Sequence, residues 1–101
     1  MATAFKQEET FSVRTLLTSL ESADAKTKNE IENTLVEIAP VEELVNELQM
    51  VKGTVRGVVA MSLIRIGETS IVHLNRAAKF NKNFEWIAQY LIREIKGSAN
   101  V

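Results

Sequence analysis

The chain has 101 residues and a mass of 11.3 kDa, the size of a single domain, because a second domain could not bury enough of its own surface. Its formal net charge of −1 argues against a general nucleic-acid binder. The absence of cysteine excludes disulfides, thiolate zinc sites and cysteine nucleophiles. One histidine, His73, and one aspartate, Asp24, cannot form a multi-histidine metal site. We therefore expect no catalytic residue, no metal and no cofactor.

The sequence shows neither a signal peptide nor a membrane-spanning segment. The first ten residues contain charged side chains and no apolar core, so they are not a signal peptide. No apolar run approaches the roughly 18 residues of a membrane-spanning helix. We expect a cytoplasmic protein without a membrane partner, built from a flexible segment 1–10, a helical domain 11–97 and a short tail 98–101.

The sequence repeats three times between positions 13 and 97, with a period of 28 to 30 residues. At an offset of 28, apolar residues of the first copy fall on apolar residues of the second, as Leu20 falls on Leu48. At an offset of 29, Leu63 of the second copy falls on Ile92 of the third. A repeat of this length corresponds to one supersecondary unit that packs against its neighbours.

Each copy contains two segments with apolar residues at i, i+3, i+4 and i+7, which is the spacing of an amphipathic helix. In chain order, the first three predicted helices cover 13–20 after a Ser12 cap, about 27–39 from a Thr27 capping box, and 40–53 with Pro40 in the first turn. The last three cover 55–66 after a Thr54 cap, 70–79 opened by Ser70, and 84–96 after an Asn83 cap. Glycines are expected to end three of them: Gly53, Gly67 (in a left-handed conformation) and Gly97.

Six helices joined by turns of two to six residues predict an all-α fold in which sequential helices are antiparallel. One helix pair cannot cover its own apolar stripe. Three stacked antiparallel pairs bury it between neighbours, so we expect a short α-solenoid.

The middle copy carries the residues of a recognisable repeat: Val55-Arg56, Ala60, Leu63, Ile66-Gly67, Ile71 and Leu74. This pattern resembles a HEAT-like repeat, in the short variant named after phycobilisome lyases. The first and third copies match only in their apolar columns, and Lys52-Gly53-Thr54 stands where the family has Asp or Asn before Val-Arg.

The resemblance implies a binding module that presents a curved helical face to a partner protein, so we expect a non-enzymatic adaptor or scaffold. Some short-repeat members attach or remove bilin chromophores on light-harvesting proteins, especially in cyanobacteria. The alternative implied by resemblance alone is therefore an accessory factor in bilin or phycobiliprotein processing, with lyase-like activity if it is an enzyme.

The helical wheel predicts where a partner would bind. The faces of 55–66 and 84–96 opposite the core carry apolar side chains, and stacking would bring them together on the concave side. We call this surface the apolar strip. It consists of Gly57, Ala60, Met61, Ile64, Trp86 and Tyr90, flanked by Arg56 and Arg93. Trp, Tyr and Arg are frequent interface anchors. The alternative is that a central helix is apolar all round because it is buried, with Trp86 and Tyr90 folded over the terminal repeat.

Charge is divided between the halves of the chain: residues 1–51 carry four basic and ten acidic side chains, and residues 52–101 carry eight and three. The resulting charges of −6 and +5 suggest self-association into a homo-oligomer or steering of an acidic partner. Arg76, Lys79 and Lys82 form the densest basic cluster. A third hypothesis is weak DNA-backbone binding there. The alternative is a solvated helix face, with Phe80 and Phe84 in the core and His73 on the surface.

Overall fold

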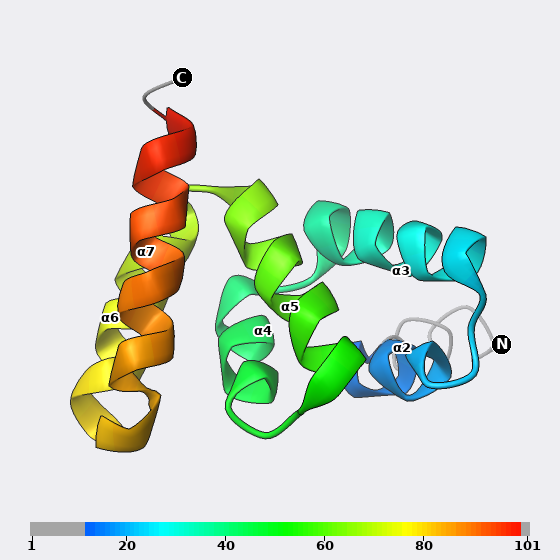
Figure 1. Ribbon diagram of the computed structural model, residues 1–101, viewed down its shortest axis with the longest axis horizontal. Helices are drawn as coiled ribbons and strands as arrows, with labels where there is room; N and C mark the ends of the chain where they lie inside the picture. Colours follow the sequence, from blue (N-terminus) through cyan, green and yellow to red (C-terminus); the bar gives the residue numbers. More distant parts are fainter. Residues whose placement is uncertain (1–11, 100–101) are drawn as a thin grey trace, which may run out of the picture.

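The computed structural model describes residues 12–99, and its side chains through Gly97. Within that range every regular element is a helix and there is no strand, so the all-α prediction is confirmed (Figure 1). The elements are α2 (Val13–Leu20), α3 (Ala25–Ile38), α4 (Val41–Leu48), α5 (Gly53–Ile66), α6 (Thr69–Phe80), the 3-10 turn η1 (Lys82–Phe84) and α7 (Glu85–Ala99). The predicted flexible segment 1–10 lies outside the described residues.

Two helix ends follow the predicted local chemistry. The hydroxyl of Ser12 accepts the backbone N–H of Thr15 at 3.4 Å and caps α2. Gly67 ends α5, and its N–H donates to the carbonyl of Leu63 at 3.1 Å. Its φ of 93° and ψ of −143° are not the left-handed helical values that we expected. They lie in a more extended region that only glycine enters readily.

The start of α3 differs from the prediction. The helix begins at Ala25, and the Oδ1 atom of Asp24 accepts the backbone N–H of Thr27 at 2.8 Å. Thr27 is therefore a capped residue and not the cap, because the aspartate three positions earlier supplies a carboxylate at the positive end of the helix. Pro40 immediately precedes α4, and its carbonyl accepts the N–H of Leu44 at 3.1 Å.

The connection between α4 and α5 was also predicted wrongly. Helix α4 ends at Leu48, since the N–H groups of Met50 and Val51 both donate to the carbonyl of Glu47. Gly53 does not close α4 but begins α5, with a φ of 62°. Thr54 consequently lies within the first turn of α5 and is not its cap.

The last two helices begin differently from the prediction. Ser70 is not a cap: it is buried, and its hydroxyl donates to the carbonyl of Leu63 at 2.9 Å, which ties α6 to the end of α5. Asn81, and not Asn83, begins the final segment, because its Oδ1 accepts the N–H of Asn83 at 3.2 Å. Gly97 does not stop α7, which continues to Ala99. Glycine inside a helix costs only about 1 kcal/mol, so it need not end one.

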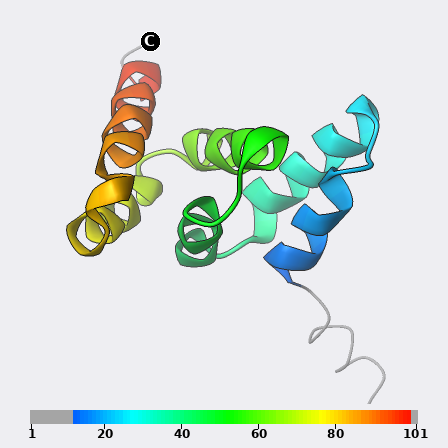
Figure 2. The ribbon, with the colours of Figure 1, turned by 60° about the horizontal axis from the view of Figure 1, so that its bottom comes forward.

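The middle helices α4 and α5 lie between the first pair, α2 and α3, and the last pair, α6 and α7 (Figures 1 and 2). Helix α4 contacts α2 on one side and α6 on the other, and α5 contacts α3 and α7 in the same way. Within residues 12–99, neither helix of the first pair contacts a helix of the last. The middle pair therefore supplies the packing surface for both ends.

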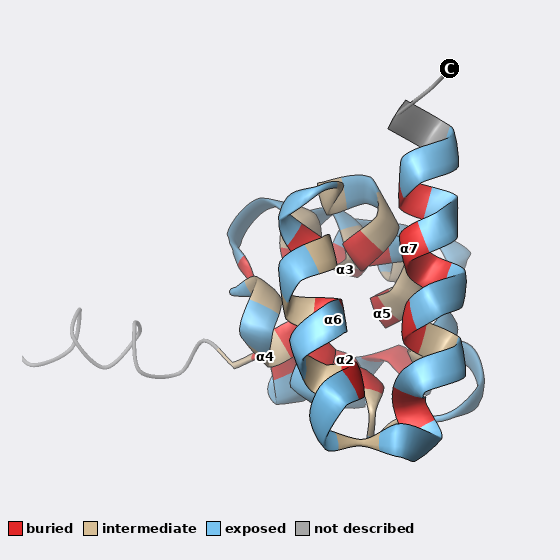
Figure 3. Cartoon of the chain, turned by 90° about the vertical axis from the view of Figure 1, so that its left-hand side faces the viewer, coloured by how far each residue is buried: buried red, intermediate tan, exposed pale blue. Residues whose placement is uncertain are grey.

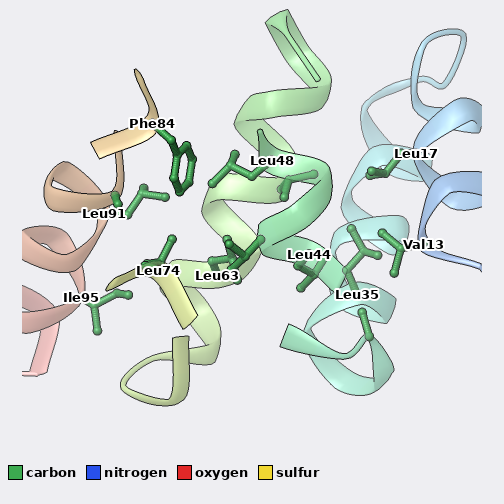
Figure 4. Close-up of a cluster of buried hydrophobic side chains, with 14 of the residues drawn as sticks. Val13, Leu17, Leu35, Leu44, Leu48, Leu63, Leu74, Phe84, Leu91 and Ile95 are labelled. Atoms are coloured by element: carbon green, nitrogen blue, oxygen red, sulfur yellow. The ribbon is translucent and has the colours of Figure 1, made fainter. Parts of the chain in front are cut away.

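One continuous apolar core runs through all three pairs (Figure 4). The fully buried large side chains come from every helix, and Figure 3 shows the buried positions of α7 on the side that faces α5 and α6. These side chains are Val13, Leu20, Leu35, Leu44, Leu48, Val59, Leu63, Leu74, Leu91 and Ile95.

Side-chain pairs also connect neighbouring helix pairs. Arg14 of α2 reaches Glu47 of α4 at 3.1 Å, and Arg65 of α5 reaches Glu32 of α3 at 2.9 Å. At the other end, the amide of Asn81 donates to Gln49 at 3.0 Å. The residues in these pairs are 33, 33 and 32 positions apart.

The Asp24 cap makes a pH-dependent contribution to stability. The backbone N–H of Thr27 and then its hydroxyl hold the pKa of Asp24 below its ordinary value of 3.8. Because the folded pKa is lowered, the contribution is complete above the unfolded value and is lost as pH falls through the folded value. We expect Asp24→Ala to lower the Tm at neutral pH, and the difference from wild type to become smaller at strongly acidic pH, where the protonated carboxyl group accepts the Thr27 N–H without its charge. Asp24→Asn retains an acceptor and should lose less. Thermal denaturation between neutral pH and pH 2 checks this, and a pH-independent difference would contradict it.

The central position of α5 predicts a sharp contrast between buried and exposed aliphatic residues. Leu63 is fully buried in the core, whereas Val72 is 59% exposed on α6. We expect Leu63→Ala to lower the free energy of unfolding by about 2–5 kcal/mol through lost burial and a cavity. Val72→Ala should change it by about 0.5 kcal/mol or less. Urea denaturation measures both, and equal effects would contradict the burial pattern.

Candidate functional site

Three large side chains of the apolar strip are exposed. Trp86 is 68% exposed, Tyr90 is 52% exposed and Met61 is 49% exposed. They lie on α7 and α5, two helices in contact. Burial in the core, the alternative to an exposed strip, is therefore wrong for these three side chains.

The rest of the predicted set divides between surface and core. Gly57 and Arg93 are exposed. Ala60 and Ile64 are half-buried and pack against the apolar core, so for these two the burial alternative holds in part. Arg56 is also half-buried. A helix with neighbours on several sides has no face that is wholly free, which the wheel of α5 alone could not reveal.

Arg56 and Trp86 meet in a hollow of about 210 Å³, which we call the Arg56–Trp86 hollow. Met61, Tyr90 and Arg93 are not part of its lining. It is formed where the ends of α4 and α6 approach the starts of α5 and α7. Its lining consists of Leu48, Gln49, Arg56, Asn81, Asn83, Phe84, Trp86 and Ile87.

Local structure fixes the walls of this hollow. The Nε atom of Arg56 donates to the carbonyl of Val51 at 3.2 Å, which orients the guanidinium. The amide of Gln49 accepts from Asn81 at 3.0 Å and donates to the carbonyl of Val45 at 3.3 Å. The ring of the buried Phe84 points toward Leu48 (Figure 4). The hollow thus combines a hydrogen-bonded cation, amides and an apolar floor beside an exposed indole.

The Arg56–Trp86 hollow differs in charge from three other hollows on the described surface. A hollow of about 530 Å³ holds Arg14 together with Glu21 and Glu47, and one of about 370 Å³ holds Arg76 with Glu42. A third, of about 390 Å³, contains two lysines and Glu85. The Arg56–Trp86 hollow contains a cation and no carboxylate. Its positive charge is therefore not compensated by its own lining.

Sequence analysis missed most of this site, because only two of its eight lining residues were among the predicted site residues. The wheel selected Arg56 and Trp86, but not Gln49, Asn81 or Asn83, which come from helix ends and the turn after α6. The sequence feature that could have indicated these residues is the presence of asparagine and glutamine side chains close to predicted helix ends. Because the predicted end of α4 was Gly53 and not Leu48, and Asn81 was not recognised as a cap, that signal did not place these residues together.

The predicted basic cluster is divided between two surfaces. Arg76 lines the hollow between α4 and α6 with His73 and Phe80, whereas Lys79 and Lys82 line the hollow between α6 and α7. Phe84 is buried as the core alternative predicted, but Phe80 is 87% exposed and that part of the alternative is wrong. Phe80 is the last residue of α6, beyond the reach of the core.

Residues 12–99 contain no group of three or more histidine, aspartate or glutamate side chains that could hold a metal ion. No helix in that range combines the length and the hydrophobicity needed to cross a bilayer. Comparison of the chain with protein-family models, curated proteins and solved structures finds no match.

The exposure of Trp86 can be measured directly because it is the only tryptophan. We expect the native protein to fluoresce at the long wavelength typical of a hydrated indole. Iodide or acrylamide should quench it nearly as well as they quench the urea-unfolded chain, since the side chain is 68% exposed. Blue-shifted emission with strong protection from quencher would contradict the exposed position.

Proposed function

We propose that the protein is a short HEAT-like α-solenoid that acts as a non-enzymatic adaptor and binds a partner protein through the face formed by α5 and α7. The proposal has two parts: the stacked architecture of three antiparallel helix pairs, and the use of the apolar strip as the binding surface.

The pattern of contacts supports the architecture. A solenoid is held together by nearest-neighbour contacts alone, and here the first helix pair contacts only the middle pair within residues 12–99. The polar ties that join neighbouring pairs span 32 to 33 residues, close to the 28- to 30-residue period of the sequence. The described chain is elongated, with extents of 44 × 29 × 25 Å, as a linear stack would be.

The single observation that carries the binding surface is the exposure of Trp86, Tyr90 and Met61 on two helices in contact. Leaving a tryptophan, a tyrosine and a methionine in water sacrifices burial worth about 1.5–3 kcal/mol for a large apolar side chain. Aromatic residues of this kind are the residues that most often dominate protein interfaces, and methionine adapts to irregular surfaces. Such a surface is suited to non-covalent binding of another protein.

The experiment compares partner capture by wild type and by the double variant Trp86→Ala/Tyr90→Ala. Proteins bound from the source cells are identified, and the direct affinity of each purified candidate is then measured. We expect the double variant to weaken binding by about tenfold to a thousandfold, since anchor residues cost about 2 kcal/mol or more each when truncated.

The matched control is Phe80→Ala, which removes an aromatic side chain that is 87% exposed on a different face. It should bind the partner as wild type does. The melting temperatures of the three proteins should agree closely, because neither surface belongs to the core. Loss of binding in the control and the double variant alike, or in neither, would reject the strip as the binding surface.

A further inference from the structure

We infer that the Arg56–Trp86 hollow recognises an acidic side chain in an extended segment of the partner protein. The carboxylate of an Asp or Glu pairs with Arg56, and an apolar residue next to it packs on Trp86. This inference rests on the proposed function, which supplies a protein partner, and it adds the chemistry of the segment that is bound.

Arg56 is a cation held in place without a counter-ion. The ion pairs within residues 12–99 are Arg14–Glu47 and Arg65–Glu32, and Arg56 takes part in neither. Its Nε is occupied by the carbonyl of Val51 at 3.2 Å, and its two terminal nitrogens make no hydrogen bond inside this range. These nitrogens form the planar donor pair that fits the two oxygens of a carboxylate.

The surroundings of Arg56 strengthen the preference for an anion. The other three hollows each place a carboxylate beside their basic residues, whereas this lining has none. Arg56 is half-buried, so solvent screens its charge less than that of a fully exposed side chain. The half of the chain that contains it carries a net charge of +5, which attracts an acidic segment over a longer range.

The size of the hollow indicates one side chain and not a larger ligand. Its volume of about 210 Å³ is below the roughly 300–1,000 Å³ of typical small-molecule sites. Leu48, Phe84 and Ile87 give it an apolar floor, and Trp86 stands exposed at its side. An acidic side chain in the hollow places its carboxylate at the cation and its methylene groups on this floor, while an apolar neighbour packs on Trp86 outside it.

The amide groups divide into two roles. Gln49 and Asn81 bond to each other and to nearby backbone, so they form the wall of the hollow. The exposed side chain of Asn83 makes no hydrogen bond to another residue of 12–99 and is available to a peptide group of the bound segment. A nucleic-acid phosphate backbone is disfavoured, because its binding usually requires several cationic side chains and the lining of this hollow contains one, Arg56.

The test is a titration of the full protein with capped pentapeptides, followed by the fluorescence of Trp86. The probe is Ser-Leu-Glu-Leu-Ser, and the matched peptide carries Gln in place of Glu. We expect saturable binding of the Glu peptide and about tenfold weaker binding of the Gln peptide, since a neutral amide pairs with the guanidinium without charge assistance. Arg56→Gln should weaken the Glu peptide equally and remove the difference between the two peptides. Added salt should weaken only the Glu peptide with wild type.

Two variants separate the carboxylate pair from charge and folding. Arg76→Gln makes the same substitution outside the hollow and should bind both peptides as wild type does. Arg56→Lys keeps the charge but not the paired donors, so its affinity for the Glu peptide should lie between wild type and Arg56→Gln. If Arg56→Gln does not fold, the two peptides on wild type and Arg56→Lys decide the question.

Equal binding of the Glu and Gln peptides, or no saturable signal at millimolar concentration, overturns the inference. Binding of a single-stranded oligonucleotide that is lost in Arg56→Gln, without peptide binding, also overturns it in favour of a nucleic acid. Failure of the proposed function is distinct, because it appears as partner capture unchanged in Trp86→Ala/Tyr90→Ala.

Discussion

The whole structure depends on the burial of α5 among all its neighbours. This helix contacts every other α-helix between residues 12 and 99, with Val59 and Leu63 fully buried at its centre. Since the first and last helix pairs do not contact each other within the described residues 12–99, α5 and its partner α4 are the only helices of that range that connect them. Most apolar side chains of α5 are therefore needed for packing against the neighbouring helices. Only the side chains of α5 that no neighbouring helix covers are available to a ligand.

That constraint explains the composition of the candidate site. Met61 remains exposed because it lies on the part of α5 that no other helix covers, whereas Ala60 and Ile64 are drawn partly into the core. The exposed aromatic residues come from α7, at the end of the described chain, where one side of the helix has no further neighbour. Binding of a bilin or of a DNA backbone is not supported by a comparable surface feature among the described residues, and each stays a prediction.

Helix type and most of the burial pattern followed from the apolar spacing, whereas several helix ends did not. The spacing of Phe84, Ala88, Leu91 and Ile95 correctly identified the buried side of α7, because burial is a property of the whole stripe. Ends depend on single hydrogen bonds. Asp24, and not Thr27, accepts the hydrogen bond that caps the start of α3. The carbonyl of Glu47 accepts from Met50 and Val51, so α4 ends before Gly53, the glycine that was expected to end it. Local competition of this kind is decided by small energy differences.

The sequence by itself determined an all-helical chain and most of the residues that face the core, because the spacing of apolar side chains along the chain follows the period of a helix. It did not determine which surface stays free. Only tertiary packing decided that Met61 is exposed while Ala60 and Ile64 are half-buried, and that the hollow around Arg56 holds no carboxylate while Arg14 and Arg65 form ion pairs. Exposure and charge compensation depend on what other helices bring to the same place, and a wheel drawn for one helix cannot contain that information.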